Sequence, residues 1–519
     1  MNTNNKYKSV IDINSKKLPV LYKSILIGLA VGIVASFYRL VLMSGEKLCF
    51  RVYDYIDSHL ILFPFVFIIL CLLGFFVGIL VSKYKMISGS GIPQVKGIIM
   101  GYFKNNWFST LIAKFGGGAL SILSGLSLGR EGPSVQLGAC VAQGIGDKFA
   151  DSQTEKKILI ASGASAGLSA AFNAPLAGAM FAMEEIFKYF SPVILLSTMT
   201  AAVVSDFIAR VIFGTSPVFN FNVQNTIPLN KYWLLFILGA ILGIAGAFYN
   251  YILLKSQKLY KKIGKSNIKV RMIIPFACAG LLGIFFPIVL GSGNKIIGQL
   301  QLSTGIRFLF LILAVKFIFS MVSFGSGAPG GIFFPLLIMG GIIGAIWGNI
   351  SINYLGCDEN LFYNFIILAM AGYFTSIVRA PITGIILLVE MTGSFTHLLS
   401  LTVVAVSAYV VADLLKSAPI YDSLLENQIS ESKIDTEYDK SKKITIETIV
   451  HHGCQAENKL VKEIAFPKEC LLISIRRGGR DIIPKGNTRI LGEDYLVFLI
   501  NLNEEPKVRE ILNRITTLQ

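Results

Sequence analysis

The stretch SLGREGPSVQ, residues 127–136, places a charged pair inside apolar, glycine-rich sequence. Arg130 and Glu131 stand side by side in it, with a glycine on either side of the pair. Charge is costly within a membrane and is retained there chiefly where function requires it. The stretch therefore predicts an interrupted helix in a membrane protein, with a carboxylate at a functional position.

The composition around this stretch is that of a polytopic all-α membrane protein. Of the 519 residues, 53% are hydrophobic and only 15% are charged, unlike the average soluble domain. Roughly ten apolar stretches of about 20 residues recur along the chain, each long enough to cross a bilayer. Examples are 60–82, 232–254 and 272–290. We therefore assign residues 19–425 to a transmembrane domain.

The charged residues predict the orientation of the chain. Residues 1–18 are polar and basic, too polar for a secretory signal, and predict a cytoplasmic N-terminus. A second basic run, Lys255–Arg271, predicts a cytoplasmic loop. The net charge of +16 is then explained by basic loops, and no nucleic-acid partner is needed. The seven cysteines are scattered without metal or disulfide spacing, so no metal site is expected.

The membrane region repeats itself at nearly one spacing. IGLAVGIVASFYRLVL resembles LGAILGIAGAFYNYIL, GSG occurs twice, and APLAGAMFAMEE resembles APITGIILLVEM, at offsets of 211, 202 and 206 residues. These matches divide the domain into halves of about 19–225 and 226–425. Duplicated halves are a common plan of transporters, whose sites lie near the midplane on helices broken by Gly and Pro.

The C-terminal part has a different character. Residues 426–442 read as a polar linker, and residues 443–519 as a small α+β domain. ECLLISIRR and DYLVFLINL have strand-like content, NKLVKEIAF and KVREILNRI have helical spacing, and RRGGRD predicts a hairpin.

Glu131 is the first candidate for chemistry. The start of a broken helix presents backbone N–H groups and the positive end of its dipole, which attract anions. Gly129 and Gly132 allow a close approach of the backbone. The motif thus combines an anion cradle with a carboxylate that competes for it. The alternative is a buried structural ion pair between Arg130 and Glu131.

Other breaks carry further candidates. Ser90, in GSGIP, has a hydroxyl that can donate to an anion or merely cap a helix. Backbone N–H groups of GGIFFP, from Gly330, could point at the same place, and its two phenylalanines could line a pore or belong to the core. Tyr421 could reach a central anion or anchor the chain at the membrane interface.

Two adjacent glutamates follow FNAPLAGAMFAM. Glu184 has a counterpart in the second half, Glu390, and is interpreted as part of the scaffold. Glu185 has no such counterpart, and an intramembrane carboxylate is a proton-relay candidate, so we assign protons to Glu185. GLSLG, from Gly125, fits a hydrolase motif but lacks the strand–turn–helix context.

The motifs GSGIPQ, GREGPSVQLG, GGIFFP and the late Tyr421 occur in an order that strongly resembles the CLC chloride channel and transporter family. The resemblance covers about residues 20–425. It implies an inverted-repeat fold of many short, tilted helices, and a homodimer with one anion pathway per subunit. Glu131 resembles the external gating glutamate of the family, and Glu185 the internal proton glutamate of its exchangers.

The same resemblance assigns the chloride ligands. Ser90 and Tyr421 correspond to the central ligands, with the backbone near Ile332 and Phe333 completing that site. The cradle of Gly129, Arg130 and Gly132 lies next to Glu131 in the motif. In the family that the chain resembles, serine at the position of Ser90 goes with chloride.

Residues 443–502 resemble the TrkA C-terminal (RCK C-terminal) regulatory domain of prokaryotic ion transport systems, through CLLISIRRGGRDIIPKGNTRILGEDYLVFL. This implies a bacterial plasma-membrane protein with a cytoplasmic C-terminus. Such domains dimerise, and some bind ligands such as cyclic dinucleotides; dimerisation without a ligand is the alternative.

The sequence thus predicts a chloride/proton antiporter in the lipid bilayer, without a cofactor. The alternative of the same fold is a passive voltage- or ligand-gated chloride channel. Intact pore motifs disfavour a ligand-gated sensor with vestigial transport. Only four histidines are present, which disfavours an intramembrane enzyme.

Overall fold

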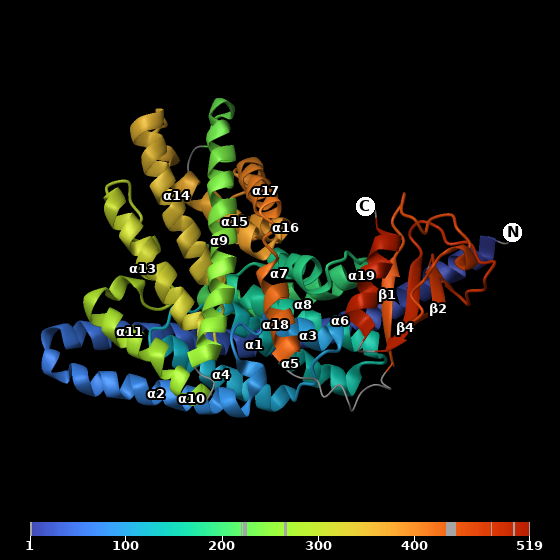
Figure 1. Ribbon diagram of the computed structural model, residues 1–519, viewed down its shortest axis with the longest axis horizontal. Helices are drawn as coiled ribbons and strands as arrows, with labels where there is room; N and C mark the ends of the chain where they lie inside the picture. The colour runs from blue at the N-terminus through green and yellow to red at the C-terminus, as the bar shows by residue number, and fades with distance from the viewer. Residues whose placement is uncertain are drawn as a thin grey trace. The chain divides into compact units, whose positions relative to one another are not determined.

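The computed structural model describes residues 3–219, 221, 226–263, 267–431, 443–478, 480–501 and 504–517, without the side chains of residues 3–17, 431, 444, 480 and 505–507. The chain forms two compact units (Figure 1). One is Ser15–Asn427, and the other combines Met1–Asn14 with Gln428–Gln519. Most of the expected linker, residues 432–442, lies outside the described residues.

The larger unit is all helical. The first half contains α1 (Thr3–Ser58), α2 (Phe63–Lys83), α3 (Ile92–Met100), α4 (Trp107–Leu123), α5 (Glu131–Phe149), α6 (Gln153–Phe172), α7 (Pro175–Phe181), η3 (Ala182–Phe187) and α8 (Pro192–Phe213). The second contains α9 (Trp233–Ile263), α10 (Ile268–Arg271), α11 (Ile273–Phe285), α12 (Asn294–Ile297), α13 (Ile306–Gly325), α14 (Phe333–Leu355), α15 (Phe362–Val378), α16 (Pro381–Thr392) and α17 (Leu398–Leu414). Helix α18 (Ile420–Glu431) follows.

Eight helices of the described residues are long and apolar enough to span a membrane, and three shorter apolar helices accompany them. In Figure 1, α9 and α13 run steeply while α2 lies nearly horizontal, so the helices do not form a simple parallel bundle. The apolar windows of α14 and α15 are 89% and 94% buried, against 17% for that of α2. The core of the unit therefore lies around α14 and α15, and α2 leaves most of its apolar surface exposed.

Matching glycines of the repeat make matching helix contacts. A Cβ on Gly28 of α1 would lie 2.7 Å from the carbonyl oxygen of Ala201 in α8. A Cβ on Gly239 of α9 would lie 2.5 Å from the Cβ of Ser407 in α17. Small residues let membrane helices approach closely, and both halves use the same device at the same place.

The halves also cap each other's helices. Glu390 of α16 accepts two hydrogen bonds, of 3.0 and 2.8 Å, from backbone N–H groups in the first turn of α7. Glu184 of η3 accepts two, of 3.1 and 2.7 Å, from the first turn of α16. Such an exchange of identical contacts is what a two-fold relation produces. This two-fold relation agrees with the inverted-repeat fold that the family resemblance implies, although α1 and α9 are long helices of 56 and 31 residues.

The smaller unit contains a four-stranded antiparallel sheet of order β1-β4-β2-β3. Its strands are β1 (Lys443–Ile449), β2 (Cys470–Arg477), β3 (Arg480–Ile482) and β4 (Tyr495–Asn501), and α19 (Glu505–Thr516) follows. The sequence pattern predicted strands β2 and β4, the hairpin between β2 and β3, and the last helix, and all of these are present.

The helix predicted for NKLVKEIAF, residues 458–466, is wrong. Only the 3-10 turn η7 (Val461–Glu463) forms there. The backbone N–H of Val461 donates to Thr488 at 2.9 Å, and that of Lys462 donates to Gly486 at 3.1 Å. Pairing with this distant segment takes the N–H groups that a helix would have used, so tertiary contacts override the local spacing.

Candidate anion-binding and proton-transfer site

The loops that precede α3, α5 and α14 are joined by backbone hydrogen bonds. Gly129 and Gly331 exchange two such bonds, both of 2.7 Å. Gly89 donates to Gly327 at 3.1 Å and accepts from Gly330 at 3.0 Å. Glycines permit these close approaches, and the result brings the N-termini of three helices together inside the unit.

Ser90 lies against the start of α5. A Cβ on Gly132 would lie 2.5 Å from the Ser90 hydroxyl and 2.7 Å from its carbonyl oxygen. Gly91, with φ of +99°, turns the chain into α3 directly after this serine. The sequence prediction that Gly132 permits a close approach thus has a specific reason, because any side chain there would displace Ser90.

The side chains of Ser90 and Tyr421 lie near each other, and both hydroxyls are buried. The two side chains approach each other from the loop before α3 and from α18. Both hydroxyl oxygens are buried, and neither makes a hydrogen bond of normal geometry to a described residue. Buried hydroxyls without acceptors are costly. Two neighbouring buried donors therefore suit a small anion, whereas a helix cap or an interface anchor would leave them bonded or exposed.

The Glu131 carboxylate is placed at the start of α5, beside the start of α14. The backbone N–H groups of Glu131 itself and of Phe334 face it. A Cβ on Gly129 would lie only 2.3 Å from Glu131 Oε2 and 3.2 Å from the Phe334 nitrogen. The side chain is 1% exposed, and Oε2 has no hydrogen-bond partner in the described part of the chain. The carboxylate thus occupies an anion cradle formed by two helix starts.

Arg130 does not form a tight pair with this carboxylate. Its Nε lies 3.8 Å from Glu131 Oε1, beyond hydrogen-bond distance, and its side chain is 14% exposed. The structural ion pair left open by the sequence is therefore a weak contact, and it leaves the second carboxylate oxygen without a partner.

Ile332 and Phe333, the predicted backbone ligands, lie at the start of α14. Ile332 caps α14, and Phe333 is its first residue, so its N–H has no partner within the helix by geometry. The ring of Phe333 packs with those of Phe172 and Phe374, at centroid distances of 5.1 and 4.6 Å. This side chain belongs to an aromatic cluster in the core.

Glu185 has different charged neighbours from Glu131. Its carboxylate accepts a 3.0 Å hydrogen bond from the ammonium of Lys96 in α3. The same ammonium pairs with Asp422 of α18. The Tyr421 hydroxyl lies within electrostatic range of both Glu131 and Glu185. The tyrosine is therefore near enough to both candidate acids to interact with each electrostatically.

The sequence reasoning missed two buried lysines that hold the GSG loops. Lys114 donates to the carbonyls of Ile87 and Gly89, at 2.9 and 2.7 Å. Lys316 does the same for the second GSG loop, at 2.8 Å to each of two carbonyls. The repeat offset of 202 residues relates the two lysines as it relates the loops. That shared offset was the available signal.

Lys96 and Asp422 were likewise missed by the sequence reasoning. Lys96 is a charge in otherwise apolar sequence close to Ser90, which is the signal that drew attention to Glu131. Asp422 stands in more polar sequence, and its only signal is that it directly follows Tyr421.

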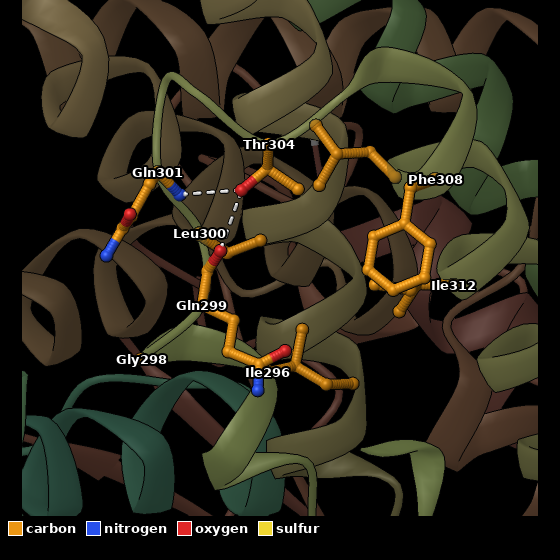
Figure 2. A pocket seen from close by; sticks show the side chains of 9 residues that line it. Ile296, Gly298, Gln299, Leu300, Gln301, Thr304, Phe308 and Ile312 are labelled. Atoms are coloured by element: carbon orange, nitrogen blue, oxygen red, sulfur yellow. Dashed lines mark hydrogen bonds between the residues drawn. The ribbon is translucent and has the colours of Figure 1, made fainter. Parts of the chain in front are cut away.

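The pocket in Figure 2 lies elsewhere, between α12 and α13, and none of the predicted site residues lines it. Thr304 holds its loop, since its hydroxyl donates to the Gln299 carbonyl at 2.9 Å and accepts from the Gln301 N–H at 3.3 Å. The hydroxyl of Thr304 thus has its hydrogen-bond partners within the loop, and this pocket gives no reason to place ion transport here.

Known proteins resemble the chain over both units. The family model described as voltage gated chloride channel matches residues 73–413, and the TrkA-C domain matches residues 446–513. The H(+)/Cl(-) exchange transporter ClcA of Vibrio cholerae is 34% identical over 444 residues, covering 82% of this chain and 94% of the relative. ClcA of Klebsiella pneumoniae is 30% identical over 438 residues, covering 82% and 93%.

Solved structures agree. The crystal structure of a slow cyanobacterial Cl-/H+ antiporter has a TM-score of 0.73 at 28% identity, covering 80% of this chain and 99% of that one. A eukaryotic CLC transporter, at 20% identity and a TM-score of 0.68, covers 79% and 74% and shares the fold. The helix order, the joined loops at three helix starts and the family match lead to one conclusion: the chain belongs to the CLC family of voltage-gated chloride channels and transporters, and it carries a TrkA-C domain after its membrane unit.

Proposed function

We infer that this protein is a secondary active antiporter that exchanges chloride for protons. The observation that carries this inference is the buried Glu131 carboxylate at the joined starts of α5 and α14. A negative group and an anion compete for the same backbone donors, so one place serves both the proton carrier and the transported ion. The named relatives are exchangers, which favours exchange over passive conduction in this chain.

Chloride binds, in this proposal, between the hydroxyls of Ser90 and Tyr421, with the backbone N–H of Phe333 close by. Its arrival next to the Glu131 carboxylate adds a like charge within a buried region. The two repel each other, so chloride entry favours departure or protonation of the carboxylate. Protonated Glu131 no longer competes for the cradle of Gly129, Arg130 and Gly132, and chloride passes.

Glu185 exchanges protons with the opposite side of the membrane. The transport cycle closes when a proton travels between Glu185 and Glu131 while chloride leaves in the other direction. A passive channel of the same fold has no need for a second buried carboxylate that is held by a lysine. The Lys96–Glu185 contact is thus the feature that favours an exchanger.

The protein works, we propose, as a homodimer in a bacterial plasma membrane, with one pathway per subunit and both termini in the cytoplasm. The basic N-terminal segment and the loop Lys255–Arg271 support this orientation. The TrkA-C domain then lies in the cytoplasm as a regulatory module, and a cyclic dinucleotide is the ligand class we propose for it. Titration calorimetry of the purified full-length protein with cyclic dinucleotides tests this point.

The transport proposal is tested with purified protein in liposomes. A chloride gradient is imposed, a potassium ionophore clamps the voltage, and a weakly buffered interior reports proton movement. An antiporter moves protons against their own gradient when chloride drives it. Chloride flux without coupled proton movement would instead establish a channel.

Glu131→Gln separates the two ions. We expect proton flux to fall by about a hundredfold, as on loss of an acid–base group, while chloride flux persists. Glu184→Gln serves as the matched control, since Glu184 caps a helix outside the anion cradle. If Glu131→Gln still pumped protons at the wild-type rate, Glu131 would not be the proton carrier.

A further inference from the structure

Four charged side chains form a continuous chain that leads to Glu185. The Lys96 ammonium donates to Glu185 Oε1 at 3.0 Å and also donates to Asp422 Oδ1. The second oxygen of Asp422, Oδ2, accepts from the ammonium of Lys188. These residues come from α3, η3, the turn after η3 and α18, so the tertiary structure alone brings them together.

Solvent exposure falls from the outer pair of these four side chains to the inner pair. The side chains of Lys188 and Asp422 are 40% and 26% exposed, whereas those of Lys96 and Glu185 are 1% and 2% exposed. Asp422 is thus the carboxylate that water reaches, and Lys96 is the group that separates it from the buried acid. A buried ammonium shared by two carboxylates is well placed to exchange protons with both.

The neighbouring acid is already engaged. Glu184 accepts backbone bonds at both oxygens, and its Oε2 also accepts from the hydroxyl of Thr383 at 2.8 Å. The charged groups that face Glu185 are Lys96, Lys188 and Asp422. Among these, only Asp422 is an acid, so it is the nearest charged group able to receive a proton from water and release it inward.

We propose that Asp422 collects protons from the cytoplasm and that Lys96 passes them to Glu185. This inference rests on the proposed chloride/proton exchange. A proton from water first binds Asp422 Oδ1. One N–H bond of Lys96 then breaks as its proton forms an O–H bond on Glu185 Oε1, and the Asp422 proton replaces it on the Lys96 nitrogen. Lys96 ends as an ammonium, Asp422 as a carboxylate and Glu185 as the neutral acid.

Lys188 orients the entry group. Its ammonium holds Asp422 Oδ2, which leaves Oδ1 directed at Lys96. The backbone of Lys188 has φ of +60°, an uncommon conformation that turns the chain directly after η3 and brings this side chain back towards α18.

The decisive variant is Lys96→Arg, measured in the liposome assay with chloride and proton fluxes recorded together. Arginine keeps the positive charge and can bond both carboxylates, but it does not give up a proton in proteins. If Lys96 is a relay, the proton flux should fall by about a hundredfold while the chloride flux remains, so the proton-to-chloride ratio falls. A merely structural lysine would tolerate arginine, or would lose both fluxes in proportion.

Asp422 is tested by a second pair of variants. Asp422→Asn is expected to lower the proton-to-chloride ratio by about tenfold, and Asp422→Glu to restore most of it. The matched control is Asp413→Asn, since Asp413 is an exposed acid of the preceding helix, 3.6 Å from Arg379. It lies outside the proposed relay, and its ratio is expected to equal that of the wild type.

The outcomes separate the relay from the exchange function. Wild-type coupling with unchanged ratios in both Lys96→Arg and Asp422→Asn would overturn the relay and leave the antiporter intact. Loss of both fluxes in equal proportion in all the variants would show a purely structural cluster and also overturn it. An uncoupled wild type would refute the exchange function, and the relay with it.

Discussion

The buried lysines of the two halves offer an internal comparison, because Lys114 and Lys316 make the same contacts at equivalent places. Lys114→Met and Lys316→Met keep an unbranched apolar side chain and remove the ammonium. In both cases the carbonyls that the lysine bonded lose a donor. The difference between the two sites follows from the remaining hydrogen bonds.

At the first site, Gly89 O also accepts from the Gly330 N–H at 3.0 Å, so only Ile87 O loses its partner among the described residues. At the second site, the described chain offers no other donor to either carbonyl that Lys316 holds. An unsatisfied buried acceptor costs about 1–3 kcal/mol. We therefore expect Lys316→Met to lower the free energy of unfolding by about twice as much as Lys114→Met.

Chloride binding should be affected in the opposite order, more by Lys114→Met than by Lys316→Met. The Lys114 loop carries Ser90, whereas the Lys316 loop carries Ser292, which bonds Glu46 and takes no part in the anion site. Ordering one loop side chain costs about 0.5–1.5 kcal/mol on binding, so freeing Ser90 should weaken chloride binding by up to about tenfold. Lys316→Met should leave chloride affinity unchanged.

The assay combines unfolding in mixed micelles with chloride titration by calorimetry. The reasoning would be refuted if Lys114→Met were the less stable variant, or if both variants bound chloride as the wild type does. Either result would mean that the loop of Ser90 is held by the joined glycines, without help from the lysine.

Three further changes have expected outcomes. Gly132→Ala places a methyl group 2.5 Å from the Ser90 hydroxyl, so chloride flux should fall at least about tenfold in liposomes while the protein still elutes as a folded species. Glu184→Gln and Glu390→Gln remove equivalent charged caps, so each should lower the free energy of unfolding by a similar amount, about 0.5–2 kcal/mol, in mixed micelles. Arg477→Met removes the ion-pair partner of the buried Asp494, which Arg477 bonds twice at 2.7 Å and which keeps a backbone bond from Leu491 at 2.8 Å. It should destabilise the C-terminal domain by about 1–3 kcal/mol, seen as proteolysis of the tail in the intact protein.

The sequence alone was sufficient for the membrane class, the repeat and the principal motifs. Apolar length determines whether a segment spans a bilayer, and the 3.6 and 2.0 residue periodicities are local properties of the chain. The charged pair at Arg130 and Glu131 was visible because charge stands out in apolar sequence. The equivalence of Glu184 and Glu390 and the scaffold interpretation also followed from the repeat, whereas the reciprocal capping did not.

Only the tertiary structure decided which groups meet. Gly129 contacts Gly331 across some 200 residues, and the shared ammonium of Lys96 joins Glu185 to Asp422 from three separate elements. The failed helix at 458–466 has the same cause, because its N–H groups pair with a distant segment. Hydrogen bonds and charge pairs act over a few ångströms in space, and the separation of their partners along the chain leaves no periodicity from which to read them.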